Sequence, residues 1–119
     1  MLTTLKNGNS AAVIDSKGAE LKSYSIGSVE LMWCGDPKYW GKTSPFLFPM
    51  IGNLRGGKTS IYGKEYAISK HGFARDNEFT PDEEAENRAV FTFSATKATK
   101  QCFPFDFTVL LEYTLEHDF

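Results

Sequence analysis

Short β-prone runs separated by turn residues recur along most of the chain, and nowhere do apolar residues hold the i, i+3, i+4 spacing of a helix over three turns. The strongest signal lies in residues 105–115, where apolar and mostly polar residues alternate at a period of two. Residues 89–95 alternate in the same way. The pattern predicts an all-β, antiparallel fold with no substantial helix, no internal repeat and no domain linker.

The N-terminal part of the chain is predicted to form an antiparallel meander. Its β-compatible runs are separated by Asn-Gly-Asn, Ser-Lys-Gly and Gly-Ser, which are typical turn sequences. Gly35-Asp36-Pro37 then ends the meander, because glycine and proline favour turns. The predicted strands are residues 2–6, 11–15, 20–26 and 29–34.

Two segments are harder to assign. Residues 38–42 fit one irregular helical turn that presents Tyr39 and Trp40. Aromatic side chains are most often core residues, so we expect these two to pack on the sheets, with stacking on a ligand as the alternative. The charged run 81–87 is expected to be a solvated loop, and residues 97–101 a turn.

Composition and charge favour a globular protein that binds a neutral ligand. Hydrophobic residues make up 41% of the chain, which is a globular composition. The 13 Lys and Arg are interspersed with 15 Asp and Glu, so we expect neither a nucleic-acid footprint nor a basic membrane-binding face. No signal pattern and no apolar run near the about 20 residues that span a bilayer are present, which favours the cytoplasm. Cys34 and Cys102 lack a metal spacing and are expected to be reduced thiols.

The segment 44–76 holds the residue types that carry chemistry. The pair Gly63-Lys64 lies between two β-prone runs, 59–62 and 65–69, and predicts a tight hairpin. Polar candidates flank this hairpin on both sides. They are Arg55, His71, Arg75 and Asp76.

The chemistry of His71 and Arg55 suits these two residues to the positioning of a polyol. An imidazole donates or accepts a proton near pH 7, and a guanidinium holds hydroxyls without changing its protonation. From the residues alone, His71 and Arg55 are nevertheless more often turn residues, and Arg75 with Asp76 is a local ion pair or an anion contact. Phosphate loops, H-E-x-x-H and G-x-S-x-G are absent, and His71 with Asp76 supplies too few ligands for a metal. We expect no cofactor and no metal.

Several segments together resemble the aldose 1-epimerase (mutarotase) family. The resemblance is carried by PKYWGKTSPFLFPMIGN, the arginine of GNLRGGK, the hairpin YGKEY, HGFARD and the later FPFDFTVLLEYTL. It implies an antiparallel β-sandwich of the galactose mutarotase-like type. Because members of that family are much longer, residues 1–119 would form a single sandwich domain or the N-terminal part of one.

The resemblance also implies a function. The family are isomerases that interconvert the α and β anomers of a monosaccharide by acid–base ring opening. It places Arg55 and His71 at the sugar. Because both residues also flank the same hairpin, we expect them to line one concave face, with His71 as the catalytic candidate. Arg75 and Asp76 are further candidates for substrate binding. The family's principal acid, a second histidine, and its base, a glutamate, lie further along the chain, and neither motif occurs here. We therefore expect no mutarotation above background from this chain alone.

Two alternatives stay open. One is a hexose-6-phosphate mutarotase, a group that also carries HGFAR, although its arginine-rich run before the F-P segment is replaced here by residues 40–44. The other is a non-catalytic carbohydrate-binding or structural fragment. His117 is expected to be structural. Open sheet edges and the apolar face of residues 105–115 predict self-association.

Overall fold

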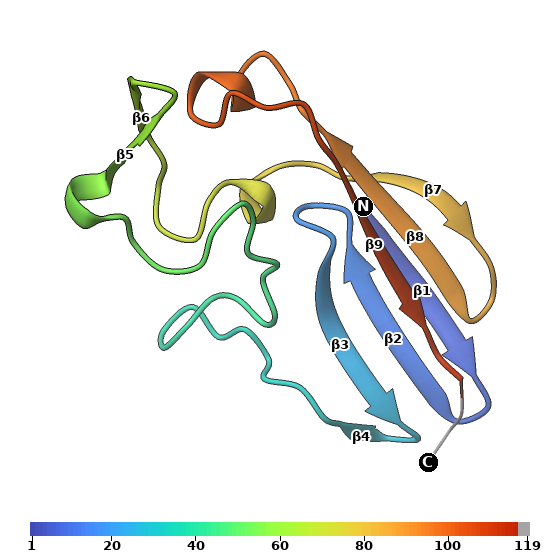
Figure 1. Cartoon of the computed structure of the whole chain (residues 1–119). Coiled ribbons are helices and arrows are strands. Elements are labelled where there is room, and N and C mark those ends of the chain that lie inside the picture. The colour runs from blue at the N-terminus through green and yellow to red at the C-terminus, as the bar shows by residue number, and fades with distance from the viewer. Residues whose placement is uncertain (117–119) are drawn as a thin grey trace.

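The computed structural model describes residues 1–116 and contains two antiparallel sheets and a separate hairpin (Figure 1). The hairpin joins β5 (Lys58–Ile61) to β6 (Lys64–Ala67). The only helices among these residues are single 3₁₀ turns, namely η1 (Arg55–Gly57), η2 (Ala74–Asp76) and η3 (Thr99–Gln101). One sheet has the order β1 (Leu2–Asn7), β2 (Ser10–Asp15), β3 (Glu20–Ile26), β4 (Val29–Glu30), and the other β7 (Thr80–Glu84), β8 (Arg88–Ser94), β9 (Thr108–Thr114). The predicted all-β antiparallel fold is confirmed.

The core lies between the inner faces of the two sheets, which makes the molecule a β-sandwich. Alternation explains which residues enter it, because successive side chains of a strand point to opposite faces. The two sheets are also joined by hydrogen bonds, from the Lys6 amide to the Glu86 carbonyl at 2.7 Å and from the Tyr113 hydroxyl to the Ala19 carbonyl at 2.7 Å. The buried apolar cluster comprises Leu5, Ala12, Ile14, Ala19, Ala74, Phe79, Ala89, Phe91 and Phe93.

The meander of β1 to β3 forms as predicted, but β4 contains only Val29 and Glu30 instead of extending to residue 34. The Glu30 side chain gives a physical reason. Its Oε1 accepts hydrogen bonds from the backbone amides of Tyr24 and Met32, both at 3.0 Å. The side chain thus takes the Tyr24 amide away from the ladder, and the next residue pair keeps only the bond from the Leu31 amide to the Tyr24 carbonyl. The chain then leaves the sheet and contains no strand until β5. We call residues 31–57 the strand-free segment.

We had expected the charged run 81–87 to be a solvated loop, but residues 80–84 form strand β7. β7 lies at the edge of its sheet, where a proline is tolerated and charged side chains face solvent. Pro81 lies opposite Phe91, and a register shift follows between Pro81 and Glu83. Hydrophobic periodicity fails here because an edge strand buries little of its own surface.

Tyr39 and Trp40 do not pack on the sheets, contrary to our expectation. Their amides both donate to the carbonyl of Asp36, at 3.1 and 2.9 Å, which closes a single turn. Tyr39 is 71% exposed and Trp40 is 51% exposed. The Trp33 indole lies edge-on to Tyr39 and donates to the Trp40 carbonyl at 2.8 Å. These aromatic side chains therefore form a surface cluster on the strand-free segment.

The hairpin forms as predicted, with its turn one residue earlier than expected, at Tyr62-Gly63. Both turn residues have positive φ, 49° and 77°, as the tight turns that match strand twist require. The hairpin projects away from the sandwich, so the molecule measures 53 × 33 × 21 Å (Figure 1). Within residues 1–116, no helix has the length and apolar character needed to cross a membrane.

The sandwich is open at one side. An apolar cavity of about 420 Å³ lies between the inner faces of the two sheets. No histidine or arginine lines this cavity, so none of the four polar candidates contributes to it. Its lining includes Leu5, Ala12, Leu21, Tyr24, Tyr113 and Leu115.

Candidate functional site

The segment that carries His71 is held against the strand-free segment by the backbone of Phe48. Phe48 and Gly72 form an isolated parallel bridge, and the Phe48 carbonyl accepts from the amides of Phe73 at 2.9 Å and Ala74 at 3.2 Å. Gly72 has a φ of 74°, a conformation that favours glycine. This crossing brings together two parts of the chain that the hairpin separates in sequence.

A cluster of phenylalanine rings lies beneath the crossing. The Phe48 ring is 6.1 Å from that of Phe73 and 5.1 Å from that of Phe107, centroid to centroid. Phe46 and Phe103 contact the same ring at 6.4 and 6.0 Å. Such aromatic pairs contribute roughly 0.5–1.5 kcal/mol each beyond the area they bury. The cluster packs around the side chain of Phe48, whose backbone bonds to the segment that carries His71.

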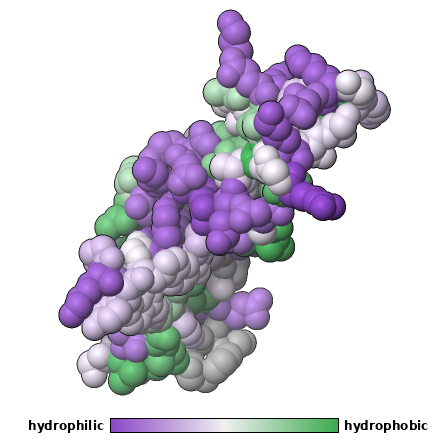
Figure 2. Space-filling view, turned by 90° about the vertical axis from the view of Figure 1, so that its left-hand side faces the viewer, coloured by the Kyte–Doolittle hydropathy of each residue, from purple (hydrophilic) through white to green (hydrophobic). Residues whose placement is uncertain are grey.

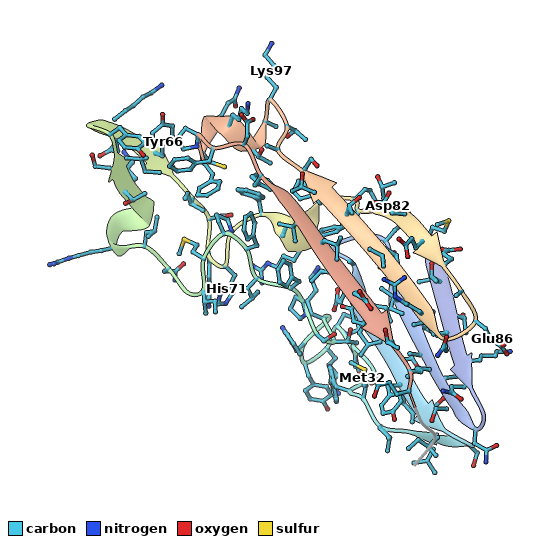
Figure 3. All side chains as sticks on the ribbon, turned by 45° about the vertical axis from the view of Figure 1, so that its right-hand side comes forward. Met32, Tyr66, His71, Asp82, Glu86 and Lys97 are labelled. Carbon is cyan, nitrogen blue, oxygen red and sulfur yellow. The ribbon has the colours of Figure 1, made fainter. Side chains whose placement is uncertain are left out.

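His71 adopts a left-handed backbone, with a φ of 65°, and its imidazole has a defined hydrogen bond. Its amide donates to the Gly52 carbonyl at 2.9 Å, and its Nδ1 accepts from the Gly52 amide at 2.8 Å. Because an amide can only donate, Nδ1 carries no proton, and the neutral ring holds its proton on Nε2. His71 lies between the hairpin and the sheets (Figure 3). Nε2–H is therefore the group that His71 offers to a ligand.

The environment of His71 favours the neutral ring. Partial desolvation and the nearby charges of Arg75 and Lys70 lower the pKa of His71 below its usual value of 6.5. The Gly52 amide acts in the same direction, because a protonated Nδ1 has no acceptor there. His71 is thus suited to act as a neutral hydrogen-bond donor at pH 7.

His71 and Arg75 line the same open pocket, which has a volume of about 440 Å³. The Arg75 Nη2 donates to the Lys70 carbonyl at 3.2 Å, so the guanidinium is tied to the same segment. No acidic side chain lines this pocket, and its two cations are Lys70 and Arg75. Figure 2 shows the side of the molecule with the hairpin and the strand-free segment, whose surface is mostly hydrophilic with separate apolar patches. The lining residues are Trp40, Pro45, Leu47, Lys70, His71 and Arg75.

Arg55 and Asp76 lie outside this pocket. Arg55 opens η1 and is exposed, and its side chain makes no hydrogen bond or ion pair with the residues that the structure describes. Asp76 is exposed in η2, and no ion pair joins it to Arg75 within residues 1–116. The segment that carries Arg55 is nevertheless fixed to His71 through Gly52. His117 lies outside the described residues.

Three pocket residues were missed by sequence reasoning as candidates for binding, namely Pro45, Leu47 and Lys70. Lys70 directly precedes His71, so its position was a usable signal. Leu47 lies in the apolar F-P run, where nothing distinguishes a wall residue from a core residue. Cys34 and Cys102 are free thiols, and no group of three potential metal ligands gathers within the described part of the chain.

Comparison with known proteins gives consistent matches. A family model described as Aldose 1-epimerase matches residues 1–118. The plasmid form of Protein LacX from Lactococcus lactis subsp. lactis is 31% identical over 121 residues, 97% of this chain and 40% of LacX. A galactose mutarotase related enzyme from Lactobacillus acidophilus is 31% identical with a TM-score of 0.95, covering 98% of this chain and 39% of that protein. A galactose mutarotase-like protein from Lactobacillus casei is 33% identical with a TM-score of 0.94, covering 98% and 40%. The chain therefore spans about 40% of the length of these relatives.

Proposed function

Because the chain belongs to the aldose 1-epimerase family, we propose that it supplies sugar-binding groups for the interconversion of the α and β anomers of a free aldose. The observation that carries the proposal is the pocket that His71 shares with Arg75. A neutral imidazole with its proton on Nε2 and a fixed guanidinium are both donors, and sugar hydroxyls and ring oxygens are acceptors.

Mutarotation needs a base to take the proton of the anomeric hydroxyl and an acid to protonate the ring oxygen. His71 is proposed as the catalytic group of this chain, donating its Nε2–H to a sugar oxygen. Arg75 would hold hydroxyl groups within the pocket. Arg55 and Asp76 are proposed as further substrate contacts at its margin, because the segments that carry them are bonded to the His71 region.

The described pocket contains one histidine and no carboxylate, so it lacks a second group for the complete acid–base cycle. We therefore propose that this chain binds the sugar but does not accelerate mutarotation by itself. Polarimetry on freshly dissolved α-glucose and α-galactose should give the buffer rate. A rate well above buffer would contradict this part of the proposal.

Sugar binding is tested by saturation-transfer NMR with glucose and galactose. His71→Asn is the informative variant, because asparagine tolerates the left-handed backbone better than most residues and leaves the fold intact. We expect the wild type to bind and His71→Asn to lose binding while its unfolding transition is retained. Equal binding by both proteins would overturn the role of His71, and no binding by the wild type would overturn the proposed function.

A hexose 6-phosphate is the second candidate substrate, and the two pocket cations favour it. Lys70 and Arg75 line the pocket without any acidic residue, and guanidinium and ammonium groups both bind phosphate. Tighter binding of glucose 6-phosphate than of glucose, lost at high salt and in Arg75→Gln, would support this candidate. Equal binding of the two ligands would exclude it.

A further inference from the structure

Glu20, the first residue of β3, is a buried carboxylate that the proposed function does not use. It is 4% exposed, whereas glutamate is rarely buried unless its charge is compensated. A residue of this kind must be stabilised by specific partners. Those partners are residues 43 and 44, which lie in the middle of the strand-free segment.

One oxygen of Glu20 accepts hydrogen bonds from the backbone amides of Thr43 and Ser44 and lies within hydrogen-bond distance of the Thr43 hydroxyl. Its Oε1 accepts from the Thr43 amide at 2.6 Å and from the Ser44 amide at 3.2 Å, and lies 3.5 Å from the Lys22 ammonium. The Thr43 hydroxyl lies 2.8 Å from the same oxygen and 2.6 Å from the Leu21 carbonyl oxygen. Because it has a single proton, it donates a hydrogen bond to one of these two acceptors at a time. The Ser44 hydroxyl donates to the Leu21 carbonyl at 2.8 Å.

These bonds lower the pKa of Glu20 despite its burial. Burial alone would raise that pKa, but the amide and hydroxyl of Thr43, the charge of Lys22 and the amide of Ser44 outweigh it. The carboxylate is therefore charged at neutral pH, when its hydrogen bonds are strongest. We call this set of charge-assisted hydrogen bonds from Thr43 and Ser44 to the buried Glu20 carboxylate the Glu20 clamp.

The clamp acts on a segment that has few other attachments. At its start, the Leu31 amide donates to the Tyr24 carbonyl at 2.8 Å and the Met32 amide donates to the Glu30 side chain at 3.0 Å. Between Met32 and Thr43, no backbone hydrogen bond joins the chain to a strand within residues 1–116. Trp40 lies on this segment shortly before the clamped residues and forms part of the wall of the pocket that contains His71 and Arg75. The position of Trp40 thus depends on where Thr43 is held.

We propose that Glu20 is a positioning residue, whose carboxylate holds Thr43 and Ser44 so that Trp40 forms the wall of the His71 pocket on which a sugar ring stacks. An exposed indole is well suited to this, because it offers a flat apolar face with a polar edge. The stacking of a sugar on Trp40 rests on the proposed function. The positioning of the segment by Glu20 does not depend on that function, and it can be measured without a ligand.

The first experiment measures the clamp without a sugar. Glu20→Met removes both oxygens at similar volume, and Glu20→Gln keeps one acceptor. Thr3→Val is the matched control, because it removes a partly buried hydrogen bond, Thr3 Oγ1 to Glu84 at 2.8 Å, elsewhere in the sandwich. Amide exchange at Thr43 and Ser44 reports the clamp. Tryptophan quenching reports the segment, since the two tryptophans of the chain, Trp33 and Trp40, both lie on it.

We expect exchange at Thr43 and Ser44 to be about tenfold faster in Glu20→Met, with stronger quenching by acrylamide, and partly restored in Glu20→Gln. Thr3→Val should lower global stability and leave both readouts unchanged. Unchanged exchange and quenching in Glu20→Met would overturn the positioning role. If Glu20→Met does not fold, Thr43→Ala weakens the clamp from the other side, because it removes the hydroxyl bond at 2.8 Å and leaves the two amide bonds. Faster exchange and stronger quenching, both smaller than those expected for Glu20→Met, would then support the role, and wild-type values of both would overturn it.

The second experiment adds the sugar. Glucose or galactose should bind about fivefold more weakly to Glu20→Met and to Trp40→Ala, with Glu20→Gln intermediate and Thr3→Val unchanged. Wild-type affinity in a Glu20→Met protein whose segment is loosened would overturn the role of Trp40 in binding. If the wild type binds no sugar, the proposed function fails, and the exchange and quenching results still decide whether Glu20 positions the segment.

Discussion

A methyl group added at Gly72 would lie 2.1 Å from the carbonyl oxygen of Phe48 and 2.7 Å from Cδ of Pro49. The backbone there is left-handed as well, so Gly72→Ala combines a clash with strain. We expect a loss of at least about 3 kcal/mol in the free energy of unfolding, measured by urea denaturation.

Gly63 separates the two effects. It has a similar φ of 77°, but an added methyl group would meet nothing within 4 Å. Gly63→Ala should therefore show strain alone, about 1 kcal/mol. Equal losses in the two variants would mean that the crossing of Phe48 over Gly72 relaxes and contributes little.

The protonation of His71 is the second prediction at this scale. Its pKa is lowered in the folded protein relative to about 6.5 in the unfolded chain, so the unfolded chain binds the extra proton first. Stability from this group is present above pH 6.5 and is lost as the pH falls towards the lowered pKa. NMR titration of the ring should give a pKa below 6.5 that rises in Arg75→Gln. A value at or above 6.5 in the wild type would contradict the assigned hydrogen bond.

At the scale of the element, the sheet of β7, β8 and β9 is stabilised by the buried side chain of Phe91 and by ion pairs of Arg88 on its surface. Phe91 is fully buried, and Phe91→Ala should cost about 3–5 kcal/mol in unfolding free energy. Arg88 bridges Glu112, with Nε–Oε1 at 2.9 Å, and Glu83, but these side chains face solvent. Arg88→Gln should cause only a small loss that disappears at high salt. A comparable loss in both variants would contradict this ranking.

Strands were predictable from the sequence where one face is buried. In β8 and β9 the alternation of phenylalanine, valine, leucine and tyrosine with polar residues is imposed by the core, so the pattern shows it. β7 has no such face, and its charges and proline look like a loop. β4 ends early because Glu30 caps the ladder with its side chain, an event that no periodicity records.

The site was predictable in part for a similar reason. His71 and Arg75 are close in sequence, so a local motif places them together. Trp40 and Leu47 belong to a segment that is bonded to Glu20 through Thr43 and to Gly72 through Phe48, and these are contacts across long sequence separations. Residue types alone did not distinguish Trp40 as a wall residue from Trp40 as a core residue.

For the whole molecule, the open side of the sandwich predicts self-association. The cavity of about 420 Å³ between the sheets is largely apolar, and β9, with Leu110 57% exposed, forms an edge of its sheet. Unpaired edges and exposed apolar surface both recruit other chains. Light scattering over a dilution series should show a mass above that of the monomer.

Leu110→Lys tests whether the edge takes part. A charge on the outer face of β9 should reduce the association without changing the core, because Leu110 points away from it. A monomer mass for the wild type at every concentration, with a sharp unfolding transition, would show that the sandwich closes on itself.

The strand-free segment is tied to β3 at Leu31 and at Thr43, and Lys38 between these ties is exposed. Trypsin should therefore cut first after Lys38. The pieces on either side of the cut would stay assembled, because the Glu20 clamp, the bond from Tyr113 to Ala19 and the shared core all join them. The nicked protein would migrate as one species in a native gel and separate into two bands only in denaturant, so this molecule can be divided into two chains without being taken apart.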